Sequence, residues 1–193
     1  MNESVKKFIE KHADLIKNED FESLYSKSFK ELYSDTGKLT EALLNAGINP
    51  LDYLTEIPAY YLHQISSVSK VVVPDYIASI GLSAFSACYN LTSIVIPNSV
   101  TSIKSYAFDD CSNLTSITIP NSITLIDYKT FSDCSSLTSI SIPNSVTSIS
   151  SGAFSNCRSL ISITIPDSVT SIGISAFSNC QSLTKILIPE NVT

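Results

Sequence analysis

The feature that most constrains the fold of this chain is an internal repeat of 23 residues. Cysteine, proline and phenylalanine all recur at this period through the second part of the sequence. The cysteines are Cys88, Cys111, Cys134, Cys157 and Cys180. Three residue types that share one period indicate a structural unit repeated along an axis. Five complete units occupy residues 68–182, and a sixth begins at Leu183 and stops at Thr193.

The unit from residue 114 to 136 shows the chemistry of one repeat. Ile117 and Ile119 alternate with small hydroxyl residues, and this period-two pattern of β-branched residues predicts a strand. Pro120 then removes a backbone donor and ends the strand. Phe131 and Cys134 are three residues apart, so a short helical or 3₁₀ turn would place both on one face.

One unit of this length cannot bury its apolar side, but stacked copies can. Equivalent residues would then lie about 4.8 Å apart, which is the spacing of paired strands. We therefore predict an α/β fold in which residues 67–193 form a right-handed solenoid with a parallel sheet of about six strands along one side. Three columns of aliphatic residues should face inward, and they begin at Val68, Val71 and Val73.

The repeat also resembles a known family, the BspA-like leucine-rich repeat. One copy carries the pattern in Leu91, Ile94, Ile96-Pro97, Val100, Ile103, Ala107-Phe108 and Cys111. The resemblance covers residues 68–193 in six consecutive copies. It implies a curved solenoid that binds proteins, often on the surface of microbial or protist cells. Two departures are Tyr76-Ile77, where most copies have Ser-Val, and Thr130, where the others have Ala.

Residues 1–66 carry no repeat and show no family resemblance, but their patterns predict an all-α module. Apolar residues from 5 to 16 keep helical spacing. Asp20 would cap a second helix that ends near Gly37, and residues 39–46 would form a third. Residues 57–65 would form a last helical segment. We expect the module to cap the first coil, whose apolar column and strand edge would otherwise be exposed. A separate binding role is compatible with capping.

The outward side of the strands is the candidate binding face, and small hydroxyl residues dominate it. Its residues are Lys70, Val72, Ser93, Val95, Ser116, Thr118, Ser139, Ser141, Ser162, Thr164, Lys185 and Leu187. A partner would be held by shape and by hydroxyl hydrogen bonds, because the face lacks the Trp, Tyr and Arg anchors of tight interfaces. The alternative is a merely soluble surface of duplicated repeats.

Three tyrosines near the end of the helical module, Tyr53, Tyr60 and Tyr61, are candidate contacts of that module. Tyrosine is favoured at interfaces, but a buried tyrosine with a partner for its hydroxyl is also typical of a core. Both interpretations stay open for these residues.

No catalytic or metal-binding constellation is predicted. A straight column of cysteines cannot converge on a tetrahedral zinc ion, and side chains about 4.8 Å apart are too distant for a disulfide. The two histidines, His12 and His63, have no cysteine close to them in the sequence, and no hydrolase or phosphate-loop motif occurs. We therefore expect a protein that is not an enzyme and that uses no cofactor.

Charge and hydropathy narrow the choice of partner and location. The net charge of −6 argues against binding to nucleic acid or to anionic lipid. No apolar stretch reaches the length of a membrane helix. Residues 1–7 are polar and lack the apolar centre of a secretory signal, so the cytoplasm is the default location. The cell surface, or delivery by a non-classical route, is the alternative.

The predicted function is non-enzymatic binding of another protein through the solenoid face, the helical module or both. Two alternatives stay open: a surface adhesin or carbohydrate-binding protein, and a regulator or inhibitor that acts through residues 1–66. The sixth unit stops before its Phe and Cys equivalents. Its strand would have an unpaired edge, which predicts either fraying or weak self-association at the C-terminal edge.

Overall fold

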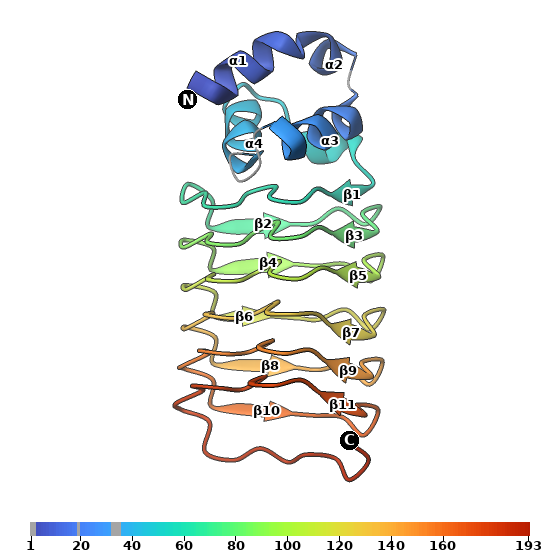
Figure 1. Cartoon of the computed structure of the whole chain (residues 1–193), viewed down its shortest axis with the longest axis vertical. Coiled ribbons are helices and arrows are strands. Elements are labelled where there is room, and N and C mark those ends of the chain that lie inside the picture. The colour runs from blue at the N-terminus through green and yellow to red at the C-terminus, as the bar shows by residue number, and fades with distance from the viewer. Residues whose placement is uncertain (1–2, 19, 32–35) are drawn as a thin grey trace.

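The computed structural model describes residues 3–18, 20–31 and 36–193. In this part of the chain, helices stack at one end of an elongated coil of short strands (Figure 1). The helices are α1 (Glu3–Lys11), α2 (Ala13–Lys17), α3 (Phe21–Glu31), α4 (Thr36–Asn45) and the 3₁₀ helix η2 (Pro50–Tyr53). One apolar core runs from the helices through the coils.

The first helices largely follow the predicted pattern. The segment predicted as one helix over residues 5–16 is divided into α1 and α2 at His12, whose ring centroid lies 4.6 Å from that of Phe8. Val5 and Phe8 are buried on the predicted apolar face. The carboxylate of Asp20 accepts a hydrogen bond from the Ser23 backbone N–H at 3.2 Å, so the predicted cap of α3 is confirmed.

Gly37 does not end the second helix as predicted, because it lies in the first turn of α4. A Cβ atom at Gly37 would collide with the carbonyl oxygen of His63. The residue is therefore glycine because α4 packs directly on the backbone of the first coil, not because a helix ends there. The predicted stop of the third helix is correct: α4 ends just before Gly47, which has φ +79°.

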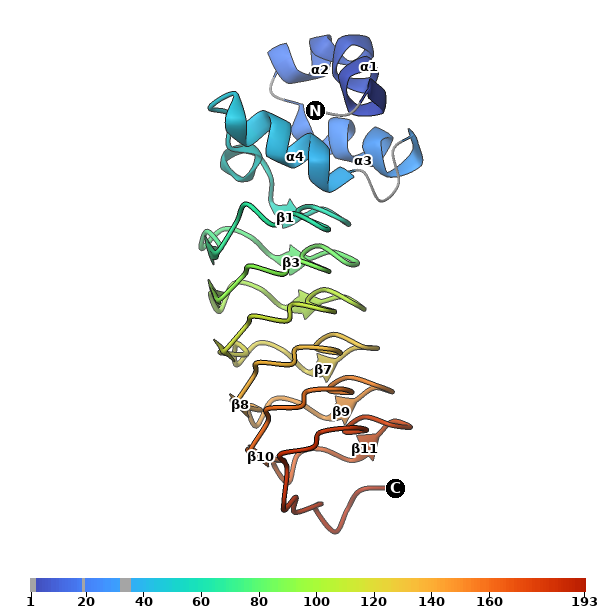
Figure 2. The same ribbon diagram turned by 90° about the vertical axis from the view of Figure 1, so that its left-hand side faces the viewer.

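The coils build two ladders of parallel strands (Figures 1 and 2). The first ladder contains β2 (Lys70–Val72), β4 (Ser93–Val95), β6 (Ser116–Ile117), β8 (Ser139–Ser141) and β10 (Ser162–Thr164). The second contains β1 (Glu56–Ile57), β3 (Ser79–Ile80), β5 (Ser102–Ile103), β7 (Leu125–Ile126), β9 (Ser148–Ile149) and β11 (Ser171–Ile172). Equivalent residues pair, as in Ile94 with Ile117. The predicted parallel pairing is confirmed, with five described strands in this ladder, and the second ladder is an addition to the prediction. Pairing is interrupted between β5 and β7, and between β6 and β8 it is reduced to a single bridge of Thr118 with Ser141.

Residues 57–65 are not helical, so that prediction is wrong. Ile57 in β1 pairs with Ile80 in β3, and the backbone N–H of Leu62 donates to the carbonyl oxygen of Ala84 at 2.7 Å. This segment is the second half of a coil that precedes the recognisable repeats. Its apolar residues have helical spacing because the tight turn of a coil, like a helix, brings residues three or four apart to one side.

The interior consists of columns in which each residue lies on its own equivalents. The phenylalanine rings stack almost parallel, and ring centroids of neighbouring coils are 5.4 to 5.6 Å apart. Each cysteine donates its Sγ–H to a carbonyl oxygen of the preceding coil, as Cys134 does to Phe108 at 3.2 Å. This hydrogen bond gives each buried thiol a polar partner. The column of small thiols predicted from the sequence is confirmed, with Cys180 only partly buried.

The turn that carries each phenylalanine is not helical, in contrast to the helical or 3₁₀ turn predicted around Phe131. Two residues in each of these turns have positive φ, such as Tyr106 at 59° and Asp110 at 58°. The turns of adjacent coils are joined by hydrogen bonds, such as that from Phe108 N to Thr130 O at 2.9 Å. The turns therefore form a third ladder. The left-handed conformation accounts for the Asp and Asn residues at its second positive-φ position.

Candidate functional site

The first ladder brings ten of the twelve predicted face residues together on one outer surface. They lie on β2, β4, β6, β8 and β10 or, for Thr118, just after β6. In-register pairing places Ser93 beside Ser116 and Ser139 beside Ser162. All ten are exposed except Ser93, which is half-buried. The alternation of buried and exposed residues along these strands therefore agrees with the predicted orientation of this outer strand face.

The hydroxyl groups of the solenoid differ in whether they form hydrogen bonds between coils. Threonines that precede the strands connect neighbouring coils, as Thr92 Oγ1 does by donating to the carbonyl oxygen of Ser69 at 2.9 Å. The hydroxyl groups of the outer strand face, from Ser93 to Thr164, form no hydrogen bond with any other group of the described chain. These hydroxyls do not hold the coils together, and they are available to a partner or to water.

Two aliphatic side chains interrupt the hydroxyl surface at the end of the face near the helices. Val72 and Val95 pair in register, and they are 72% and 59% exposed. The third coil has Thr118 at the equivalent position, so the solenoid does not require an aliphatic residue there. An exposed valine pair on a sheet surface is a candidate contact point for another molecule.

Lys185 and Leu187 do not join the outer strand face as predicted. Residues 183–189 form no strand, and they stand away from β10 at the free end of the stack (Figure 2). Leu183 and Ile186 still pack against the core, and beyond the stretch the side-chain amide of Asn191 donates to the carbonyl oxygen of Asp167 at 2.8 Å. A groove of about 860 Å³ separates it from β10. Leu187 and Ile188 are exposed there.

The three tyrosines of the helical module are mainly packing residues. Tyr60 and Tyr61 are 8% and 2% exposed, so in this structure neither offers the contact surface that was predicted for them. Tyr61 packs edge-on against Phe85, with ring centroids 6.3 Å apart. Tyr53 is partly exposed, but its ring stacks on Phe21 at a centroid distance of 4.9 Å. Tyr60 and Tyr61 are buried because the helices cover the first coil.

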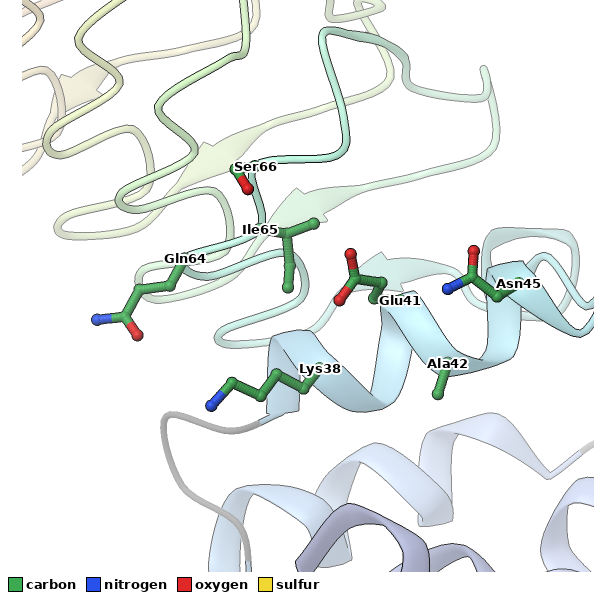
Figure 3. Close-up of a pocket in the computed structure, with 7 residues that line it drawn as sticks. All are labelled: Lys38, Glu41, Ala42, Asn45, Gln64, Ile65 and Ser66. Atoms are coloured by element: carbon green, nitrogen blue, oxygen red, sulfur yellow. The ribbon is translucent and has the colours of Figure 1, made fainter. Parts of the chain in front are cut away.

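A hollow of about 310 Å³ lies where α4 meets the first coil (Figure 3). Its lining residues are Lys38, Glu41, Ala42, Asn45, Gln64, Ile65 and Ser66. Figure 3 shows the ends of the Lys38 and Gln64 side chains extending away from the centre of the hollow. Glu41 accepts a hydrogen bond from Ser67 Oγ at 2.7 Å, which connects the helices to the coil. The hollow is thus an open seam between the two parts of the molecule.

Sequence reasoning missed a group of tyrosines on the turn ladder. Tyr89 and Tyr128 are exposed, and the rings of Tyr106 and Tyr128 meet edge-to-face at 5.2 Å. Lys129 Nζ lies 5.9 Å from the centroid of the Tyr106 ring and 5.8 Å from that of Tyr128. Burial raises the pKa of the neighbouring Asp109 carboxyl. The signal was present in the sequence, because these residues depart from their repeat equivalents.

Metal and proton chemistry find little support in the described residues. No group of three or more His, Cys, Asp or Glu residues in them is placed to hold a metal ion. Burial lowers the pKa of His63, which faces the ring of Tyr60 at 5.2 Å. Burial also raises the pKa of the cysteine thiols, to about 12 for Cys88, which makes them poor nucleophiles. Among these residues, no helix has the length and apolar character that crossing a bilayer requires.

Comparisons with known proteins agree with this geometry. A family model described as the BspA type leucine rich repeat region, in six copies, matches residues 55–184. This match begins at β1, before the first repeat recognised in the sequence. No curated protein sequence matches the chain.

Solved structures share the solenoid. A leucine rich cell surface protein from Faecalibacterium prausnitzii is 41% identical with a TM-score of 0.60, over 62% of this chain and 31% of that protein. The leucine rich repeat protein of T. pallidum is 32% identical with a TM-score of 0.69, over 72% of this chain and 65% of that one. A leucine-rich repeat protein from Bacteroides ovatus is 28% identical with a TM-score of 0.60, over 73% and 42%. The chain thus spans between about a third and two thirds of these proteins. With its repeats matched and its solenoid shared, the chain belongs to the BspA-type leucine-rich repeat family.

Proposed function

We propose that this protein binds another protein through its outer strand face and has no enzymatic activity. The observation that carries the proposal is the Val72–Val95 pair, which stays exposed although the other coils show that the fold accepts hydroxyl residues in its place. An exposed aliphatic pair beside unbonded hydroxyl groups offers a partner both apolar contact and hydrogen bonds on one strip. Leucine-rich repeat proteins of this family typically act in protein interaction or surface adhesion, and the fold is typically non-enzymatic.

Substitution of the pair by repeat-equivalent residues tests the proposal. Val72→Thr with Val95→Thr keeps the shape and β-propensity of both side chains and exchanges one methyl group for a hydroxyl in each. The matched control is Leu125→Ser, which removes an exposed aliphatic residue from the second ladder, where other coils carry serine.

The measurement is quantitative affinity capture from cells of the source organism, followed by titration of the purified partner. We expect the double variant to lose at least about tenfold in affinity, or roughly 1.4 kcal/mol, while the control binds like the wild type. A partner captured equally by all three proteins would place the binding surface elsewhere and sink the proposal.

Two further proposals concern the location of the protein and a regulatory role of residues 1–66. A location on the cell surface is supported by the relative from Faecalibacterium prausnitzii, which is a cell surface protein, whereas the cytoplasmic default rests on the sequence alone. Protease treatment of intact cells distinguishes the two locations. A regulatory role of residues 1–66 would use the seam at α4, the open polar surface that the helices share with the first coil.

A further inference from the structure

A second hollow, separate from the outer strand face, lies among the turns that follow β7, β9 and β11. Its volume is about 400 Å³, within the usual range of small-molecule sites. Gly152 lines it at a position where the adjacent coils carry Lys129 and Ser175. A Cβ atom at Gly152 would lie 3.0 Å from Lys129 Cγ, so the lysine stem rests against the glycine. The hollow is therefore a local departure from the repeat.

Two apolar side chains line this hollow from the coils before and after Gly152. Tyr128, which is 40% exposed, precedes Gly152 by one coil, and Ile174, which is 83% exposed, follows it by one coil. The equivalent residues of the other coils are Leu82, Ser105 and Ser151. Because the fold accepts serine at this position, neither the aromatic ring nor the aliphatic side chain is needed for packing.

The polar part of the hollow contains two stacked side-chain amides. Asn179 Nδ2 donates to Asn156 Oδ1 at 2.9 Å, and this is the only hydrogen bond of either side-chain amide within the described residues. The Asn156 amide N–H groups and the Asn179 carbonyl oxygen therefore remain as a donor and an acceptor for a ligand. Hydroxyl groups complete the lining, from Ser151, Ser155, Ser175 and Ser178.

The charge of the hollow argues against an ionic ligand. Lys129 is its one charged lining residue, and its ammonium group lies over the rings of Tyr106 and Tyr128. The same ammonium group opposes the effect of burial on the pKa of Asp109, so its charge is partly balanced within the protein. A phosphate or a cation would find no concentrated opposite charge here. A neutral ligand with one apolar and one hydroxyl-bearing side fits the lining better.

We propose that this hollow binds a neutral pyranose, as a free sugar or as the terminal ring of a glycan. The C–H face of the ring would lie on Tyr128 and Ile174, because aromatic and aliphatic side chains cover the apolar side of a sugar. Adjacent sugar hydroxyls would pair with the donor of Asn156 and the acceptor of Asn179. The site is open and small, so we expect a dissociation constant of about 1 mM for a single ring. This activity goes beyond protein binding at the outer strand face and does not depend on it.

Saturation-transfer NMR with the methyl glycosides of glucose, galactose and N-acetylglucosamine tests the proposal on the full chain. We expect saturable transfer to at least one of them, at concentrations up to about 20 mM. Tyr128→Ser should weaken binding at least about tenfold, and Gly152→Ser should also weaken it, because the added Cβ would displace the Lys129 stem that lines the hollow. Both variants carry residues found at the equivalent positions of other coils, and circular dichroism verifies that they remain folded.

The control variant is Arg158→Ser, which removes an exposed side chain outside the hollow and also restores a repeat equivalent. It should bind the sugars like the wild type, as should the Val72→Thr, Val95→Thr variant. Absence of transfer to all three glycosides would overturn the proposal. Equal binding by Tyr128→Ser and the wild type would also overturn it, since the sugar would then lie elsewhere.

Discussion

The two ends of the solenoid carry nearly the same repeat residues but differ in what covers them. At the helical end, α4 and the first half-coil lie over Phe85 and Cys88, which are completely or almost completely buried. At the other end, the equivalents Phe177 and Cys180 are only partly buried. The difference shows that in a stack of coils the burial of a residue depends on the adjacent levels, and much less on its own coil.

The coils next to the helices also differ in sequence from the other coils. Tyr61, Leu62 and Ile65 replace the Ala, Phe and Cys of the standard turn. The hydroxyl of Tyr76 donates to the carbonyl oxygen of Leu51 at 2.8 Å, which explains the departure of the first repeat at that position. No comparable departure occurs in residues 183–188, which keep the repeat pattern and still stand apart from β10.

The largest expected difference between the covered interior and the free end concerns the phenylalanine column. Phe131→Ala should lower the free energy of unfolding by about 3–5 kcal/mol, because the ring is buried between two others. Phe177→Ala should cost about half of that, since its ring stacks on one side only. Urea denaturation measures both. Ser141→Ala on the outer face is the control and should cost under about 0.5 kcal/mol. Equal midpoints for the two phenylalanine variants would contradict the comparison.

The contact of α4 with the first coil provides a second test. Gly37→Ala should destabilise the protein by about 1–3 kcal/mol, because the added Cβ collides with the backbone of His63. Hydrogen exchange should rise in residues 57–65 and stay unchanged in the third and fourth coils. Gly47→Ala is the matched control: nothing lies within 4 Å of its Cβ position, so only the cost of positive φ applies. If the two variants gave the same exchange pattern, the contact of Gly37 with the His63 backbone would not be what holds the helices on the first coil.

Thiol reactivity should show the same difference in burial between the inner coils and the C-terminal coil. Cys180 should react first with a thiol reagent, and Cys111 and Cys134 only after coils open, because they are almost completely buried. Burial raises the pKa of Cys180 as well, so its reaction should accelerate as the pH rises and thiolate forms. Mass spectrometry after timed labelling assigns each site. Labelling of Cys134 as fast as Cys180 would contradict the expected difference in burial.

The smallest expected effect is self-association through the exposed side chains of residues 187 and 188. The exposed Leu187 and Ile188 beside the groove at β10 predict weak self-association at high protein concentration. Leu187→Lys with Ile188→Glu should reduce it. Light scattering over a concentration series provides the measurement. A wild type that stays monomeric throughout, and behaves like the variant, would show that the open end is not adhesive.

Much of the candidate binding surface was predictable from the sequence, but not all of it. The strand residues from Lys70 to Thr164 were placed correctly, because the period-two pattern alone decides which side chains point outward. The hollow at Gly152 was not found. Its departures from the repeat are visible in the sequence, yet Tyr128, Gly152 and Ile174 come from three coils. Only the geometry of the turn ladder shows that these three residues meet.

The sequence by itself determined the coil, its inward columns and the family, because a strict period makes every residue the neighbour of its own equivalent. Tertiary structure alone decided where the stack begins, why residue 37 is glycine, and which tyrosines are hidden. These features depend on contacts between residues that are not equivalent, such as Gly37 with His63 and Tyr76 with Leu51. The repeat period does not predict such contacts, because they form only where the helices pack on the first coil.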